Sequence, residues 1–313
     1  MTRQALIAVL TFFATLLRFD AVDVGAAQEP GPTFRSGVDL VRLSVVARDR
    51  KGRFVASLSA DDFEVVDNGD VRPIAEFGRD LAGVSVALLF DVSGSMEARL
   101  QSAREAATHI LRWLDVDRDE AAVFTFDTRL DEVAPFARGR RQLPDGMASI
   151  APFGATSLFD AIAQTAELVA HRTDRRHAVV VLTDGIDNAS RLSASEVSGI
   201  ASMIDVPVYI IGIVPAIDNP SADIGVPAAG KSPLIGSLMD LANWTGGTAL
   251  MASTPAERSA AAREIVEELR QQYFIAFESS GTPGWHPLVV RARGKDLTIR
   301  ARSGYFAGHS RPN

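Results

Sequence analysis

The middle of the chain alternates between almost entirely apolar segments and segments whose apolar residues recur at helical spacing. The apolar runs occupy residues 84–90, 122–126, 178–182 and 206–213. Between or after these apolar runs, apolar residues recur at helical spacing over residues 100–114, 158–169, 234–244 and 256–271. Strands that are apolar throughout are buried on both faces, and intervening helices let consecutive strands run parallel. The alternation therefore predicts an α/β fold with a doubly wound, mostly parallel sheet.

Both flanks of this region are predicted to form β structure without helices. Residues 37–80 contain three strand-like segments, with a strong turn signal at Asp67-Asn68-Gly69, and residues 272–306 contain three more. Three strands alone bury a poor core, so we expect the flanks to combine into one small β-sandwich domain. Two independent β appendages are the competing interpretation. The predicted divisions are 28–83 and 272–313 for the two parts of the sandwich, and 84–271 for the α/β domain inserted between them.

The first 27 residues are typical of a cleavable export signal. Arg3 supplies the positive start, and the apolar run from Ala5 to Leu17 is too short to span a bilayer. Small residues at Gly25 and Ala27 suit a signal peptidase, so we expect cleavage near Ala27 and a secreted or periplasmic protein. An uncleaved anchor or a buried helix is the alternative. No later segment is long and apolar enough for a stable membrane span in the mature chain.

Composition excludes several classes of function. The formal net charge is −7, with 39 acidic and 32 basic residues, which argues against a nucleic-acid partner. The chain has no cysteine, which excludes disulfides, thiolate metal sites and thiol catalysis. Its five histidines show no metal-binding spacing, and no G-x-S-x-G motif is present. The sequence therefore predicts a protein without enzymatic activity, and it gives no indication of the oligomeric state.

Oxygen-bearing side chains follow two of the apolar strands. Asp91-Val92-Ser93-Gly94-Ser95 comes directly after residues 84–90, Thr183-Asp184 comes after residues 178–182, and Gly154-Ala155-Thr156-Ser157 precedes a helix. Since the carboxyl ends of parallel strands meet at one edge of the sheet, we expect these groups to lie together. Carboxylates and hydroxyls suit a hard divalent cation such as Mg²⁺. Helix capping alone is the competing interpretation, but it needs no second carboxylate on the same edge.

The same residues resemble the metal-ion-dependent adhesion site of the von Willebrand factor A domain. The matching elements are Asp-x-Ser-x-Ser after a strand, Thr in a Gly-x-Thr turn and Asp in Leu-Thr-Asp-Gly. The likeness covers roughly residues 84–271, where the implied fold is Rossmann-like. Flanking sequences such as Asp62-Phe63-Glu64-Val65 and Arg302-Ser303-Gly304-Tyr305 are similar to those of bacterial exported proteins called von Willebrand factor A-related.

This resemblance implies a function and a set of ligands. Mg²⁺ is the implied cofactor, with Mn²⁺ or Ca²⁺ also acceptable, and its implied ligands are Asp91, Ser93, Ser95, Thr156 and Asp184. The two serines would bind the ion directly, and Thr156 directly or through water. The two aspartates would bind directly or through water and orient the other ligands. An Asp or Glu carboxylate of a protein partner would complete the site, so the implied function is an exported, metal-dependent protein-binding module of the adhesion type.

A second motif supports an alternative function. Residues Gly225 to Ser232 fit the G-x-x-x-x-G-K-[ST] pattern of a phosphate-binding loop, which would indicate a Mg²⁺-dependent hydrolase or NTPase. That motif acts only directly between a strand and a helix, and residues 217–223 before it do not resemble a strand. Pro227 also removes one N–H donor from the loop. We therefore favour a chance match.

Overall fold

The computed structural model describes residues 40–79, 83–172, 175–203, 205–215 and 233–307. All of these residues belong to one compact unit that begins at Val38. Within them, no helix is long and apolar enough to cross a membrane. The predicted export signal at 1–27 and the motif at 225–232 lie outside the described residues.

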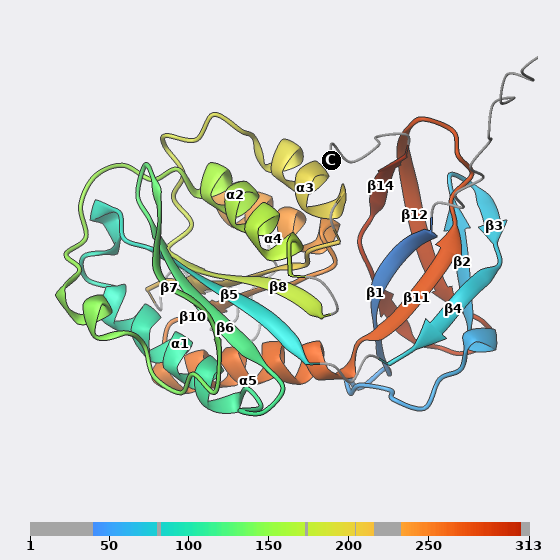
Figure 1. The fold of residues 1–313 in the computed structure, drawn as a ribbon, viewed down its shortest axis with the longest axis horizontal. Coiled ribbons are helices and arrows are strands. Elements are labelled where there is room, and N and C mark those ends of the chain that lie inside the picture. The colour runs from blue at the N-terminus through green and yellow to red at the C-terminus, as the bar shows by residue number, and fades with distance from the viewer. Residues whose placement is uncertain (1–39, 80–82, 173–174, 204, 216–232, 308–313) are drawn as a thin grey trace, which may run out of the picture. The chain divides into compact units, whose positions relative to one another are not determined.

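A six-stranded sheet forms the centre of the α/β region (Figure 1). Its strand order is β10-β9-β8-β5-β6-β7, and all neighbours pair in parallel except β6 and β7, which are antiparallel. The strands are β5 (Val84–Asp91), β6 (Glu120–Phe126), β7 (Leu130–Arg138), β8 (Arg176–Thr183), β9 (Val208–Ile213) and β10 (Ala249–Ala252). The predicted mostly parallel sheet is therefore confirmed.

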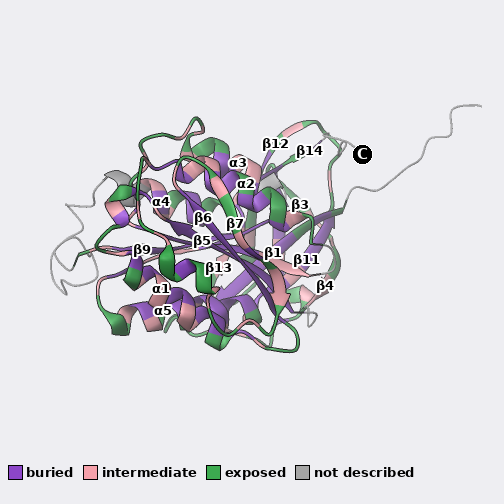
Figure 2. Cartoon of the chain, turned by 60° about the vertical axis from the view of Figure 1, so that its left-hand side comes forward, coloured by how far each residue is buried: buried purple, intermediate pink, exposed green. Residues whose placement is uncertain are grey.

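Helices cover both faces of this sheet. They are α1 (Leu100–Trp113), α2 (Leu158–Ala170), α3 (Ala194–Met203), α4 (Pro233–Trp244) and α5 (Pro255–Gln271). Alternate residues of β5 enter two separate cores: Leu88 packs in the core that includes α1 and α5, and Leu89 packs in the core with α2, α3 and α4. The central strands are accordingly buried along their length (Figure 2). This arrangement is the doubly wound fold that continuous apolar strands predict.

Two antiparallel four-stranded sheets form the β-sandwich. Their orders are β13-β1-β11-β4 and β14-β12-β2-β3. The strands are β1 (Leu40–Arg48), β2 (Phe63–Asp67), β3 (Asp70–Arg72), β4 (Ile74–Gly78), β11 (Tyr273–Glu278), β12 (Gly284–Ala292), β13 (Thr298–Arg300) and β14 (Gly304–Ala307). Each sheet combines strands from both flanks, and side chains from both sheets share one apolar core. The residue limits of the predicted domains remain a prediction.

The third strand expected within residues 37–80, over Val71, Ile74 and Phe77, does not form one strand. The segment from Val71 to Phe77 is divided at Pro73 into β3 and β4, which belong to different sheets. Proline has no N–H to donate to a sheet and has a fixed φ, so the chain leaves one sheet at this residue and enters the other. The strand β14 was also absent from the sequence prediction.

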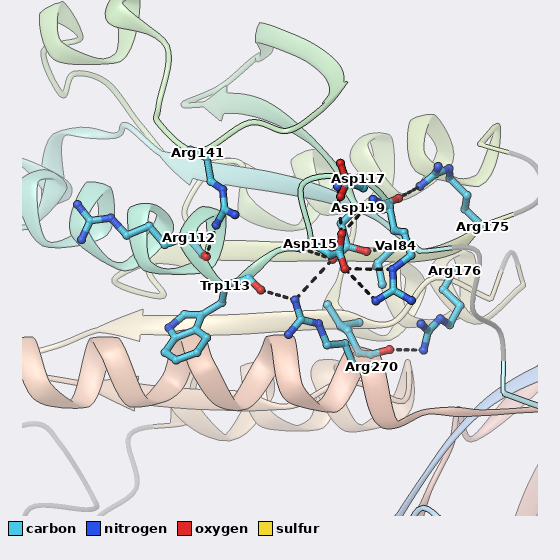
Figure 3. A network of polar contacts seen from close by, with 12 residues as sticks. Val84, Arg112, Trp113, Asp115, Asp117, Asp119, Arg141, Arg175, Arg176 and Arg270 are labelled. Carbon is cyan, nitrogen blue, oxygen red and sulfur yellow. Dashed lines mark hydrogen bonds and ion pairs between the residues drawn. The ribbon is translucent and has the colours of Figure 1, made fainter.

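The opposite end of the sheet from the strand carboxyl ends holds a network of aspartates and arginines (Figure 3). Val84 begins β5 and donates its N–H to Asp119 Oδ1 at 3.0 Å, while Asp119 Oδ2 accepts the N–H of Asp115 at 2.7 Å. Arg270, near the end of α5, lies 3.9 Å from Asp119 and donates to the carbonyl of Trp113. We call this group the amino-edge network. It holds together the points where the chain enters and leaves the α/β region.

Candidate metal centre

Asp91 is the last residue of β5 and is fully buried. Its Oδ1 accepts hydrogen bonds from the N–H of Ser93 at 3.0 Å and from the Ser93 hydroxyl at 2.6 Å. Its Oδ2 accepts the hydroxyl of Thr183, the last residue of β8, at 2.7 Å. Burial raises the pKa of Asp91 to about 6; the hydrogen bonds from Ser93 and Thr183 oppose this shift, and the charge of Asp184 adds to it. The carboxyl group is thus held in one orientation where its negative charge is poorly solvated.

The turn after Asp91 presents two hydroxyls beside it. Ser93 is buried, and its Oγ lies 3.1 Å from Oγ of Ser95. The 3₁₀ turn Gly94–Met96 follows, in which Met96 donates its N–H to the carbonyl of Ser93 at 3.0 Å. The Met96 side chain is fully buried in the apolar core and anchors the turn. Asp91, Ser93 and Ser95 therefore form one continuous hydrogen-bonded chain.

Thr156 lies in a loop that packs against this turn. The N–H of Gly94 donates to the carbonyl of Gly154 at 3.1 Å, and the N–H of Phe153 donates to the carbonyl of Val92 at 2.9 Å. Gly154 has φ +85°, a conformation that favours glycine. Asn188, in the loop after β8, accepts the N–H of Thr156 at 2.8 Å through its side-chain oxygen. The Thr156 loop is therefore bonded both to the serine turn and to the segment after β8.

Asp184 follows β8 and forms an ion pair with Arg99. Its Oδ2 lies 3.0 Å from Nη1 of Arg99, and its side chain is only 4% exposed. The same nitrogen of Arg99 donates to the carbonyl of Ser95 at 2.8 Å. Asp184 also lies near enough to Asp91 for its charge to raise the pKa of that residue. The guanidinium thus joins the two halves of the candidate site.

The five predicted ligands therefore gather at the carboxyl edge of the sheet, around the ends of β5 and β8. Their donor atoms are carboxylate and hydroxyl oxygens, which suit Mg²⁺ and related hard cations. Among the described residues, no group of three or more His, Cys, Asp or Glu side chains is placed to hold a metal. The chemistry of the donor set fits the predicted divalent cation; its binding remains a prediction.

Sequence reasoning assigned no supporting role to three contributors: Thr183, Asn188 and Arg99. Thr183 adjoins a predicted ligand, but nothing local indicates that its hydroxyl reaches Asp91, which lies 92 positions away. A contact of Arg99 could have been predicted from the sequence, because Arg99 directly precedes helix α1, where the helix dipole disfavours a cation. A basic residue at that position suggests an acidic partner elsewhere in the fold.

Comparison with known protein families shows which family the region around the candidate site matches. Residues 86–186 match the family model described as von Willebrand factor type A domain. The matched span begins in β5, ends just after Asp184, and includes all five candidate ligands. This segment is a von Willebrand factor type A domain. The predicted resemblance of this region to the von Willebrand factor A domain is confirmed, and the roles of the candidate ligands remain a prediction.

Solved structures include chains similar to this one. The conserved hypothetical protein BatB from Bacteroides thetaiotaomicron is 18% identical, with a TM-score of 0.46; the match covers 59% of this chain and 98% of that one. A protein named von Willebrand factor type A from Catenulispora acidiphila is 15% identical, with a TM-score of 0.49, over 88% of this chain and 75% of that one. No curated protein matches the chain.

Proposed function

We propose that the von Willebrand factor type A domain of this protein binds one divalent cation and uses it to hold an acidic side chain of a protein partner. Mg²⁺ is the proposed ion, with Mn²⁺ or Ca²⁺ as acceptable substitutes. The proposed ligands are Asp91, Ser93, Ser95, Thr156 and Asp184. The bound ion would supply an electrophilic centre for an external carboxylate. The proposal assigns no catalysis to the site.

The observation that carries this proposal is the charge balance at the carboxyl edge. Asp91 and Asp184 contribute two carboxylates within one buried cluster, of which Arg99 offsets one charge, and the surrounding hydroxyls contribute none. A divalent cation would cancel both charges and remain open to a further anionic ligand, because neutral hydroxyls do not reduce its charge further. A partner carboxylate is the group that best meets this requirement.

The protein's own residues would fix the geometry of the site before any ion binds. The hydroxyl of Thr183 holds one oxygen of Asp91, and Ser93 holds the other. Asn188 holds the backbone of Thr156 through two hydrogen bonds, at 2.8 and 3.1 Å. Such supporting contacts orient metal ligands and reduce the cost of ordering them on binding.

We further propose that the protein acts outside the cytoplasm, as a secreted or periplasmic protein. This part of the proposal depends on the export-signal pattern of residues 1–27. A divalent-ion site built from hydroxyls and carboxylates suits that location, because it contains no thiolate that oxidation would inactivate.

Calorimetric titration of the purified chain with Mg²⁺ tests the metal site. We expect one binding event in the natural protein and none in Asp91→Ala. Asp117→Ala is the matched control, because Asp117 is an exposed aspartate of the loop before β6, at the other edge of the sheet. Undiminished binding by Asp91→Ala, in protein that folds normally, would remove the assignment.

A second experiment tests the partner. Proteins of the exported fraction are passed over the immobilised chain in Mg²⁺, and the retained proteins are eluted with chelator. A partner that fits the proposal is retained by the natural chain, released by chelator and not retained by Asp91→Ala. Replacement of its contacting Asp or Glu by Asn or Gln should abolish retention. A partner retained equally in chelator would place the binding surface elsewhere.

A further inference from the structure

Arg99 occupies an unusual position for a cation. It directly precedes the 14-residue helix α1, whose amino end favours negative charge. The residue is nevertheless held there by two contacts of one nitrogen, to Asp184 Oδ2 at 3.0 Å and to the Ser95 carbonyl at 2.8 Å. Both partners belong to residues proposed as metal ligands. The acidic site, rather than the helix, therefore accounts for the location of this guanidinium.

The charges at the site show what Arg99 does when no divalent ion is bound. Asp91 and Asp184 bring two negative charges, and the contacts of the described residues place one positive charge, that of Arg99, on Asp184. Asp184 is nearly inaccessible to water, so loss of this partner would leave a buried, uncompensated carboxylate. Arg99 therefore stabilises the ion-free site.

The same ion pair opposes metal binding. A divalent ion that binds Asp184 directly would bring two further positive charges close to the Arg99 guanidinium. Part of the interaction between Arg99 and Asp184 must then be given up, and the like charges repel. We propose that Arg99 is an internal counter-cation, which competes with the divalent ion for Asp184 and so weakens metal binding. This inference rests on the proposed metal site and describes its regulation.

The neighbouring arginine on the same helix provides a matched control. Arg104 lies in the next turn of α1, and its Nη2 donates to the carbonyl of Ile150 at 3.1 Å rather than to a carboxylate of the site. Replacement of either arginine by glutamine removes one positive charge from this end of the molecule. Only the Arg99 substitution removes the direct contact with Asp184.

The test is a calorimetric Mg²⁺ titration of the natural chain, Arg99→Gln, Arg99→Lys and Arg104→Gln, together with thermal unfolding of each in chelator. We expect Arg99→Gln to bind Mg²⁺ about tenfold more tightly, as for the loss of a competing charge-assisted hydrogen bond. In chelator it should unfold at a lower temperature than the natural chain. Arg99→Lys keeps the charge but not the fork of donors, so both of its values should be intermediate. Arg104→Gln should bind Mg²⁺ with natural affinity.

The outcomes separate this inference from the proposed function. Natural affinity in Arg99→Gln, or an equal gain in Arg104→Gln, would overturn the role of Arg99 while the metal site stands. Weaker binding by Arg99→Gln would also overturn it. If neither the natural chain nor Arg99→Gln binds Mg²⁺, the proposed metal site fails and the inference fails with it. If Arg99→Gln does not fold, Arg99→Lys takes its place in the test. Mg²⁺ binding by Arg99→Lys that is tighter than in the natural chain would support the role of Arg99, and natural affinity would overturn it.

Discussion

The two edges of the central sheet use similar residues for different purposes. In the amino-edge network, Asp119 accepts two backbone N–H groups and lies near Arg270, while Asp115 is bound by Arg118 at 2.8 Å. At the carboxyl edge, Asp91 is held mainly by hydroxyls, and Asp184 is the one of these two described carboxylates that is paired with an arginine. Arginines surround the first cluster (Figure 3). Among the described contacts of the second, the two carboxylates of Asp91 and Asp184 share one arginine, Arg99.

This difference distinguishes a structural cluster from a binding site. The amino-edge network satisfies its carboxylates with protein groups, so its interactions are complete in the folded chain. The carboxyl edge keeps two carboxylates close together although burial already raises the pKa of one of them to about 6. Arrangements that leave a charge poorly compensated are typical of functional sites. Substitutions at the two edges should therefore affect different properties.

The largest expected effect on stability lies in the amino-edge network. Asp119→Ala would leave the N–H groups of Val84 and Asp115 without their acceptor in a buried region. We expect a loss of about 3 kcal/mol in the free energy of unfolding, measured with urea in chelator. The exposed Asp117→Ala should change it by less than about 0.5 kcal/mol. A loss of less than about 1 kcal/mol in the free energy of unfolding for Asp119→Ala would show that the amino-edge network does not stabilise the fold in this way.

The next effect concerns stabilisation by the ion itself. A ligand that binds only the folded state stabilises it by about 2.7 kcal/mol at a concentration of 100 Kd. We expect Mg²⁺ to give this gain in the natural chain and no gain in Asp91→Asn. In chelator, Asp91→Asn should differ from the natural chain by only about 1 kcal/mol, because it removes a poorly solvated charge while keeping the side-chain shape. If Mg²⁺ increased the free energy of unfolding of Asp91→Asn as much as that of the natural chain, the ion would not bind through Asp91, and the carboxyl edge would not differ from the amino edge in this respect.

A smaller effect is expected from the hydroxyl that orients Asp91. Thr183→Val keeps the shape of the side chain but removes the 2.7 Å hydrogen bond to Asp91 Oδ2. We expect Mg²⁺ binding about tenfold weaker by calorimetry, which corresponds to about 1.4 kcal/mol. Affinity equal to that of the natural chain would mean that this contact is structural only.

The smallest predicted effect concerns the loop that carries Thr156. Asn188→Ala removes the acceptor of the Thr156 N–H, but the Thr156 carbonyl still accepts the N–H groups of residues 188 and 189. We expect Mg²⁺ affinity to fall about threefold, which corresponds to about 0.6 kcal/mol. A loss as large as that of Asp91→Asn would show that Asn188 has a more direct role.

Much of the fold could be predicted from local sequence because the central strands are buried on both faces. The runs at 84–90 and 178–182 contain apolar residues almost throughout, and they became β5 and β8. The edge strand β7 was missed because it is partly exposed, contains Pro135 and lacks a regular alternation of polar and apolar residues. Edge strands bury less surface, so their sequences carry a weaker pattern.

The candidate site was predictable in part for a similar reason. Its proposed ligands follow buried strands or precede a helix, and both positions can be recognised from sequence. The supporting contacts join residues far apart in the chain: Arg99 and Asp184 are separated by 85 positions, and Asn188 and Thr156 by 32. No local pattern specifies such pairs, because the packing of the whole sheet brings them together.

The most direct test of the account is anomalous diffraction from crystals of the chain soaked in Mn²⁺, which replaces Mg²⁺ at oxygen sites. We predict one strong anomalous peak at the carboxyl edge, among the oxygens of Asp91, Ser93, Ser95, Thr156 and Asp184. The amino-edge network should show none, although it is also rich in aspartate. No peak at the carboxyl edge, or a peak beside Asp115 and Asp119 instead, would contradict the distinction between the two edges.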